Sequence, residues 1–244
     1  SFMLSLSEVG RTFIGTKEFI LNAKIPMQPV KSSLVHSIAP IGGDAKKPHP
    51  TLILLHGRGA NEQDLLGLTS YFDPRLLVIA ARAPLAFPYG GYTWYEILNV
   101  GTPEPAQFAE SYARLAQFID DVRRHYPVDP ERLFLLGFSM GAVMSFAYAL
   151  TKPESVHSII AHSGYIPEDT PLVFQWNKLQ GKGFFVAHGE FDPVIGVQFS
   201  RRAKELLSNT PADLHYKEYP IPHTMSEESV LDLSSWLRTR MGDR

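Results

Sequence analysis

Short apolar runs alternate with longer segments of helical period from about residue 32 to the end of the chain. Runs such as Thr-Leu-Ile-Leu-Leu (51–55) and Leu-Phe-Leu-Leu (133–136) are continuously apolar, as strands are when both faces of a sheet are covered. The predicted strands are Leu34–Ala39, Thr51–His56, Leu76–Ala81, Leu133–Phe138, Val156–His162, Phe184–His188 and Leu214–Tyr219. The predicted helices are Glu62–Thr69, Ala106–His125, Met140–Thr151, Gly196–Ser208 and Glu227–Arg240. This order predicts an α/β protein with a mostly parallel central sheet and helices on both faces.

Composition narrows the chemistry that the chain can carry. The formal net charge of −2 is too small to attract polyanions, so nucleic acid is not expected as a partner. The chain has no cysteine, which excludes disulfides, thiolate metal sites and a cysteine nucleophile. Covalent chemistry would therefore run through an oxygen or an amine.

The sequence also predicts a cytoplasmic protein without a membrane span. No run approaches the roughly 18 apolar residues of a membrane helix, and the first thirty residues lack the pattern of a signal peptide. Residues 1–31 precede the alternation, and we expect this N-terminal extension to form an edge hairpin or a cover over a pocket. The long aromatic segment Pro84–Pro105 is expected to be a functional loop.

The pentapeptide Gly-Phe-Ser-Met-Gly (137–141) lies between a predicted strand and a predicted helix. The pattern G-x-S-x-G alone is weak evidence, since it arises by chance in on the order of one chain in ten of this length. Its position strengthens it, because a sharp turn between strand and helix lifts a serine hydroxyl into the open. Ser139 is therefore the candidate nucleophile, and the alternative is an ordinary tight turn.

A serine hydroxyl needs a base, and the base needs an orienting carboxylate. Asp192, in His-Gly-Glu-Phe-Asp-Pro (188–193), and His223, in Pro-Ile-Pro-His-Thr (220–224), both follow predicted strands in the order serine, acid, histidine. Both would lie at the carboxyl ends of strands, where α/β sheets gather their sites. His188 competes as the base and Glu190 as the acid, but His188 precedes the acid and Glu190 is not followed by a fixing proline.

An oxyanion at the site would need two backbone N–H donors. The residue after the nucleophile, Met140, provides one candidate. The turn His-Gly-Arg-Gly (56–59) after an apolar strand makes the Arg58 N–H the other, and the alternative is a simple glycine turn. Candidate walls for a substrate pocket are Trp94, Tyr95, Tyr165 and Ile195.

These segments together resemble the phospholipase/carboxylesterase family, which includes small carboxylesterases and acyl-protein thioesterases. The likeness is carried by Leu-His-Gly-Arg-Gly-Ala-Asn-Glu-Gln-Asp-Leu (55–65), Gly-Phe-Ser-Met-Gly (137–141), His-Gly-Glu-Phe-Asp-Pro-Val (188–194) and Pro-His (222–223). It implies an α/β-hydrolase catalytic domain over residues 32–244, without a large lid domain, that needs no cofactor or metal. It also suggests a homodimer. Met140 and Gly196 depart from the glutamine and proline that many relatives carry.

The sequence thus predicts a serine carboxylesterase that acts on short-to-medium acyl esters through a Ser-His-Asp triad and an acyl-enzyme. Two alternatives stay open. One is an acyl thioesterase or lysophospholipase of the same family, and the other is a binding module that keeps the fold without catalysis. A peptidase of this fold usually adds a domain for which 244 residues leave little room.

Overall fold

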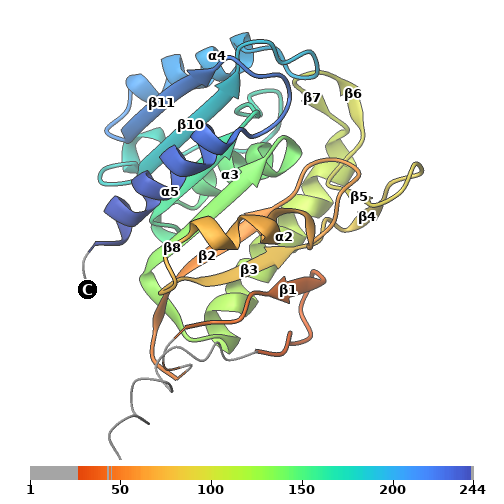
Figure 1. The fold of residues 1–244 in the computed structure, drawn as a ribbon. Coiled ribbons are helices and arrows are strands. Elements are labelled where there is room, and N and C mark those ends of the chain that lie inside the picture. The colour runs from red at the N-terminus through yellow and green to blue at the C-terminus, as the bar shows by residue number, and fades with distance from the viewer. Residues whose placement is uncertain (1–26, 43, 45, 243–244) are drawn as a thin grey trace, which may run out of the picture.

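The computed structural model describes residues 27–42, 44 and 46–242. Most of the predicted N-terminal extension, residues 1–26, lies outside the described residues. The chain is built around a seven-stranded sheet in the order β1-β3-β2-β8-β9-β10-β11 (Figure 1). Its strands are β1 (His36–Ile38), β2 (His49–Leu55), β3 (Leu77–Ala81), β8 (Val128–Phe138), β9 (Ser158–His162), β10 (Gly183–Gly189) and β11 (Asp213–Tyr219). Only β1, at one edge, runs antiparallel to its neighbour.

Two hydrophobic clusters cover the two faces of the sheet, as the continuously apolar strands predict. On β2, Ile53 and Leu55 belong to one cluster, while Leu52 and Leu54 belong to the other. The first cluster packs against the helices α2 (Pro105–His125), α3 (Met140–Thr151) and α4 (Gln198–Ser208). The second packs against the 3-10 helix η1 (Asp64–Tyr71) and α5 (Glu227–Met241), and Figure 1 shows α5 on the opposite side of the sheet from α2 and α3.

Most element boundaries differ from the prediction by one to three residues, and two elements differ by more than that, one in length and one in helix type. Strand β8 begins at Val128 and runs through Pro130, because the pairing register with β2 shifts between His49 and Thr51. Residues in such a bulge need no ladder partner, so a proline is tolerated there. The segment predicted as the helix Glu62–Thr69 is the 3-10 helix Asp64–Tyr71, and no side chain caps its first turn.

The segment 84–105 contains two small antiparallel sheets that the sequence did not predict. Strand β4 (Leu85–Ala86) pairs with β5 (Tyr92–Thr93), and β6 (Ile97–Asn99) pairs with β7 (Thr102–Pro103). Both extend beyond the main sheet on the side where its parallel strands end (Figure 1). The remaining elements are the short 3-10 helices η2 (Pro153–Ser155) and η3 (Trp176–Lys178). None of the helices in the described residues has both the length and the apolar character needed to cross a membrane.

Leu136 offers a test of the core. Its side chain is fully buried on β8, between Leu54 of β2 and Ile160 of β9. We expect Leu136→Ala to lower the free energy of unfolding by about 2–5 kcal/mol, because it removes buried methyl groups and leaves a cavity. Urea unfolding at neutral pH measures the change. Leu231→Ala on α5, at a side chain that is 53% exposed, is the control and should cost less than about 0.5 kcal/mol. Equal losses in the two variants would contradict the placement of Leu136.

Candidate active site

Ser139 occupies the turn between β8 and α3 in a conformation that few non-glycine residues adopt. Its φ is 54° and its ψ is −118°. Such strain persists only where the surrounding structure enforces it, and it is common at functional sites. Here the Ser139 N–H donates to the His162 carbonyl at 2.9 Å, while the Ser139 carbonyl accepts from the N–H groups of Ala142 and Val143. The backbone on both sides of the serine is therefore fixed.

The two glycines of the pentapeptide allow this turn to form. A Cβ at Gly137 would lie 2.1 Å from the carbonyl oxygen of Gly141, and a Cβ at Gly141 would lie 1.9 Å from the carbonyl oxygen of Leu55. Both separations are impossible for a side chain, so larger residues would push α3 away from β8 and β2. The glycines let the first turn of α3 contact the end of β2 directly.

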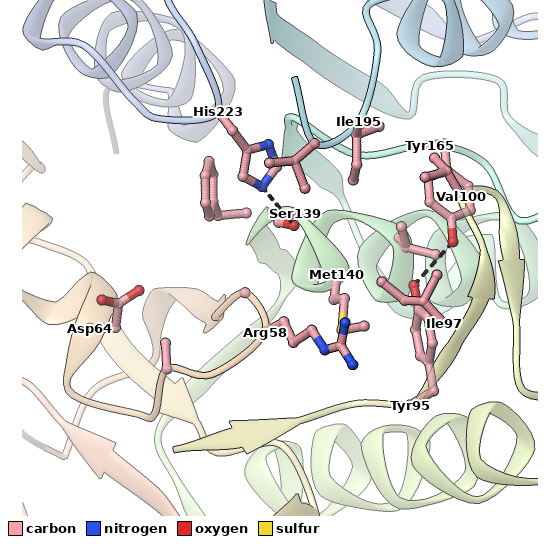
Figure 2. A pocket seen from close by; sticks show the side chains of 15 residues that line it. Arg58, Asp64, Tyr95, Ile97, Val100, Ser139, Met140, Tyr165, Ile195 and His223 are labelled. Carbon is pink, nitrogen blue, oxygen red and sulfur yellow. Dashed lines mark hydrogen bonds between the residues drawn. The ribbon is translucent and has the colours of Figure 1, made fainter. Parts of the chain in front are cut away.

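A chain of hydrogen bonds joins Ser139, His223 and Asp192, the three residues that the sequence analysis singled out. Nε2 of His223 lies 3.0 Å from Oγ of Ser139, and a dashed line in Figure 2 marks this hydrogen bond. Nδ1 of His223 lies 2.6 Å from Oδ2 of Asp192. The loops that carry them follow β8, β10 and β11, whose carboxyl ends meet at one edge of the sheet. The His223 ring also packs against the Phe138 ring at 5.0 Å between centroids.

The carboxylate of Asp192 is buried and held from several sides. Its Oδ1 accepts hydrogen bonds from the N–H groups of Val194 and Ile195, at 2.8 and 2.9 Å. Its Oδ2 accepts from His223 and also lies 3.3 Å from Nε2 of His188. The aspartate therefore organises its own loop and orients His223 at the same time.

The two rivals from the sequence, His188 and Glu190, form no hydrogen bond with Oγ of Ser139 in the described residues. His188 is fully buried beside the acid, and burial lowers its pKa, so its ring is neutral. Its Nε2 donates to the Ile195 carbonyl at 2.7 Å, while its Nδ1 has no hydrogen-bond partner among the described residues. His188 thus supports Asp192 through a neutral imidazole. Glu190 is exposed.

Arg58 and Met140, whose backbone N–H groups are the donors predicted for an oxyanion, line the same cavity as Ser139. Met140 is the first residue of α3, and the first N–H groups of a helix have no intrahelical partner. In the turn after β2, the N–H groups of Gly59 and Ala60 donate to Tyr92 and Gly57, whereas that of Arg58 makes no backbone hydrogen bond within the described part of the chain. Both donors are therefore available to a bound group.

His56 and Trp94 hold the turn that carries Arg58. Nδ1 of His56 donates to the Gly57 carbonyl at 2.6 Å, and its Nε2 accepts from the Ala83 N–H at 3.0 Å. The Trp94 indole donates to the His56 carbonyl at 2.9 Å. Trp94 is fully buried and is not among the residues that line the cavity, so it supports the site from behind.

The cavity beside Ser139 has a volume of about 390 Å³, within the usual size range for small-molecule sites. Three of the four predicted wall residues, Tyr95, Tyr165 and Ile195, line it (Figure 2). Sequence reasoning missed Gly57, Ala60, Asp64, Ile97, Val100, Phe138, Val143 and Val194. Val143 could have been found, because it stands one helical turn after Ser139 on α3.

The charge of the Arg58 side chain is already paired. Its guanidinium pairs with Glu96 at 2.7 Å and lies over the Phe87 ring at 4.5 Å from the centroid. Among the described residues, no group of three or more histidine or acidic side chains could hold a metal ion.

Comparison with known proteins identifies the family of the chain. The model of the phospholipase/carboxylesterase family matches residues 36–241. Acyl-protein thioesterase 1 of Mycosarcoma maydis is 28% identical over 224 residues, covering 78% of this chain and 91% of that protein. A probable carboxylesterase of Arabidopsis thaliana, described as SOBER1-like, is 25% identical over 205 residues, covering 78% of each.

Solved structures show the same fold. The Bacillus cereus carboxylesterase superposes with a TM-score of 0.75 at 25% sequence identity, covering 85% of this chain and 94% of that one. A carboxylesterase from Mesorhizobium loti superposes with the same TM-score of 0.75. The fold is therefore that of the α/β-hydrolases, and the described residues include no large lid domain.

The buried residue His162, whose carbonyl accepts from the Ser139 N–H, makes stability depend on pH. Burial, with His188 and His223 nearby, lowers the pKa of His162 to about 3. An unfolded chain binds this proton below about pH 6.5, whereas the folded chain does not until near pH 3, so stability falls as pH drops below about 6.5. We expect His162→Gln to reduce the loss of unfolding free energy between pH 6 and pH 5 by up to about 1.4 kcal/mol.

Denaturant unfolding of the wild type and the variant at both pH values measures this difference. His125→Gln, at an exposed position near the end of α2, is the control and should keep the wild-type slope. A wild-type slope in His162→Gln would show that the folded protein protonates His162 as readily as the unfolded chain does.

Proposed function

The chain belongs to the phospholipase/carboxylesterase family, and we propose that it is a serine carboxylesterase that cleaves short-to-medium acyl esters through an acyl-enzyme. The observation that carries the proposal is the hydrogen-bonded series Ser139–His223–Asp192 at 3.0 and 2.6 Å, in a cavity with an apolar wall. Esterase and thioesterase relatives support hydrolysis of ester-type bonds. The choice of ester and the serine mechanism are our proposal.

In the first step, Oγ of Ser139 attacks the carbonyl carbon of the ester while Nε2 of His223 takes the hydroxyl proton. Asp192 accepts the Nδ1–H of His223, which fixes the imidazole tautomer and stabilises the imidazolium. Negative charge on the former carbonyl oxygen is stabilised by the N–H groups of Arg58 and Met140. When the tetrahedral intermediate collapses, His223 gives the proton to the leaving alcohol.

The second half repeats these roles with water. His223 removes a proton from water as the water attacks the acyl carbon, and the same two N–H groups stabilise the second oxyanion. Collapse of that intermediate returns the proton to Oγ of Ser139 and releases the carboxylic acid. The scheme uses side chains and backbone alone.

The cavity supports an acyl chain as the group bound beside the nucleophile. One side of it is apolar and is formed by Ile97, Val100, Val143 and Ile195. These side chains come from the 84–105 segment, α3 and the loop after β10 that carries Asp192. Apolar area removed from water contributes roughly 25 cal/mol per Å². An acyl chain is a better fit to this wall than a charged or strongly hydrated group.

A thioester substrate is the second candidate, because relatives such as that of Mycosarcoma maydis are named acyl-protein thioesterases. The same attack and the same oxyanion donors serve an ester and a thioester. We also propose a cytoplasmic location, a homodimeric state and no nucleic-acid partner for the protein.

The proposal predicts serine-dependent hydrolysis of p-nitrophenyl esters from acetate to palmitate, with an optimum at short or medium chain length. Ser139→Ala should lower kcat by about 10⁴-fold or more, because only binding and the oxyanion donors remain. Ser145→Ala is the matched control, since Ser145 is buried on the same helix and donates only to the Gly141 carbonyl. Folded Ser139→Ala protein with wild-type turnover would overturn the proposal.

Two further measurements separate the alternatives. Labelling by a fluorophosphonate probe at Ser139 is expected for an activated serine and not for a binding module without catalysis. Comparing kcat/KM for an acyl thioester with the oxygen ester of the same acyl chain distinguishes a thioesterase from a carboxylesterase. A rate detectable only with thioesters would replace our first candidate by the second.

A further inference from the structure

Two tyrosine hydroxyls meet inside the apolar part of the cavity. Tyr95 follows β5 and is fully buried, and Tyr165 follows β9 and is 5% exposed. Both line the cavity that contains Ser139, and their oxygens lie 3.4 Å apart (Figure 2). This contact is longer than the 2.7–2.8 Å typical of hydroxyl hydrogen bonds, so the hydrogen bond between the two hydroxyls is weak.

Counting protons shows that the pair has a hydrogen-bond donor to spare. Each phenol carries one proton, and the mutual contact uses one of the two. The backbone of Gly101 is a further hydrogen-bond partner of the Tyr165 hydroxyl, and a backbone N–H supplies a donor but no acceptor. Within the described residues, neither hydroxyl makes another hydrogen bond with an acceptor. Burial raises the pKa of both phenols, so both protons stay in place at neutral pH.

The surroundings leave this donor to whatever occupies the cavity. The side chains of Ile97, Val100 and Ile195, which line the cavity with the pair, carry no hydrogen-bond acceptor. A plain alkyl chain packed here would leave a buried donor unsatisfied, which is unfavourable. A chain with an oxygen at the right position would accept the proton and keep its remaining carbons against the apolar wall.

We propose that the acyl pocket is built for acyl chains that carry a neutral oxygen acceptor, such as a ketone or an ether, beyond the scissile carbonyl. This inference rests on the proposed esterase function. A carboxylate at the same place is disfavoured, because two uncharged phenols would be its only partners and Arg58 is already paired. The Tyr95–Tyr165 pair acts in binding and takes no part in the proton transfers at Ser139.

The test compares matched esters with and without the oxygen. The p-nitrophenyl esters of 4-oxopentanoate and 3-methoxypropanoate are each compared with the pentanoate ester, and that of 5-oxohexanoate with the hexanoate ester. Each enzymatic rate is divided by the rate of hydroxide-catalysed hydrolysis of the same ester. We expect kcat/KM for at least one oxygenated ester to exceed that of its partner by about 3- to 10-fold, the range of one net hydrogen bond.

The double variant Tyr95→Phe/Tyr165→Phe is decisive, because each single variant keeps one phenol proton. The ratio of kcat/KM for the oxygenated ester to kcat/KM for its plain partner should fall to about one in the double variant. In at least one single variant the ratio should be reduced but stay above one. Tyr148→Phe is the matched control, since Tyr148 is equally buried but does not line the cavity, and it should keep the wild-type preference.

The outcomes separate this inference from the proposed function. Ser139-dependent hydrolysis of plain esters with no preference for oxygenated chains would overturn the inference and leave the esterase proposal standing. A preference that survives in the folded double variant would overturn it as well. Absence of Ser139-dependent hydrolysis of any ester would overturn both the proposed function and this inference. If the double variant does not fold, the wild-type ratios still decide, because values at or below one contradict the inference.

Discussion

The close approach of α3 to the end of β2 is the constraint on which the rest of the site depends. Gly141 lies against the Leu55 carbonyl, at a distance that leaves no room for a side chain. That contact holds Ser139 in its strained conformation and brings the first N–H groups of α3 beside the turn that carries Arg58. The proposed nucleophile and the two proposed oxyanion donors are therefore positioned by one packing contact between backbones.

The loop after β10, which carries Asp192, joins the proposed triad to the wall of the cavity. Asp192 binds the N–H groups of Val194 and Ile195, and the side chains of both residues line the cavity. His188 donates to the Ile195 carbonyl and lies against the other carboxylate oxygen. A substitution at Ile195 chosen to change the pocket would thus also disturb the carboxylate that orients His223.

Patterns that arise from local chemistry could be predicted from the sequence. Continuous apolar runs identify strands buried on both faces. Gly137 and Gly141 identify the turn that carries Ser139, because neither position has room for a side chain. The hairpins within 84–105 could not be predicted, since strands of two or three residues carry no period. The role of Trp94 was also beyond reach, because its partner, the His56 carbonyl, is a backbone atom far away in sequence.

The buried histidines show how the fold protects the proposed chemistry. In the proposed attack, His223 becomes a cation that is hydrogen-bonded to the carboxylate of Asp192. His162 and His188 are close enough to influence this charge, and a proton on either would oppose it. Burial keeps both rings neutral by lowering their pKa values, so their N–H groups serve as hydrogen-bond donors without adding positive charge. Asp192 is then the charge paired with the imidazole that contacts the serine.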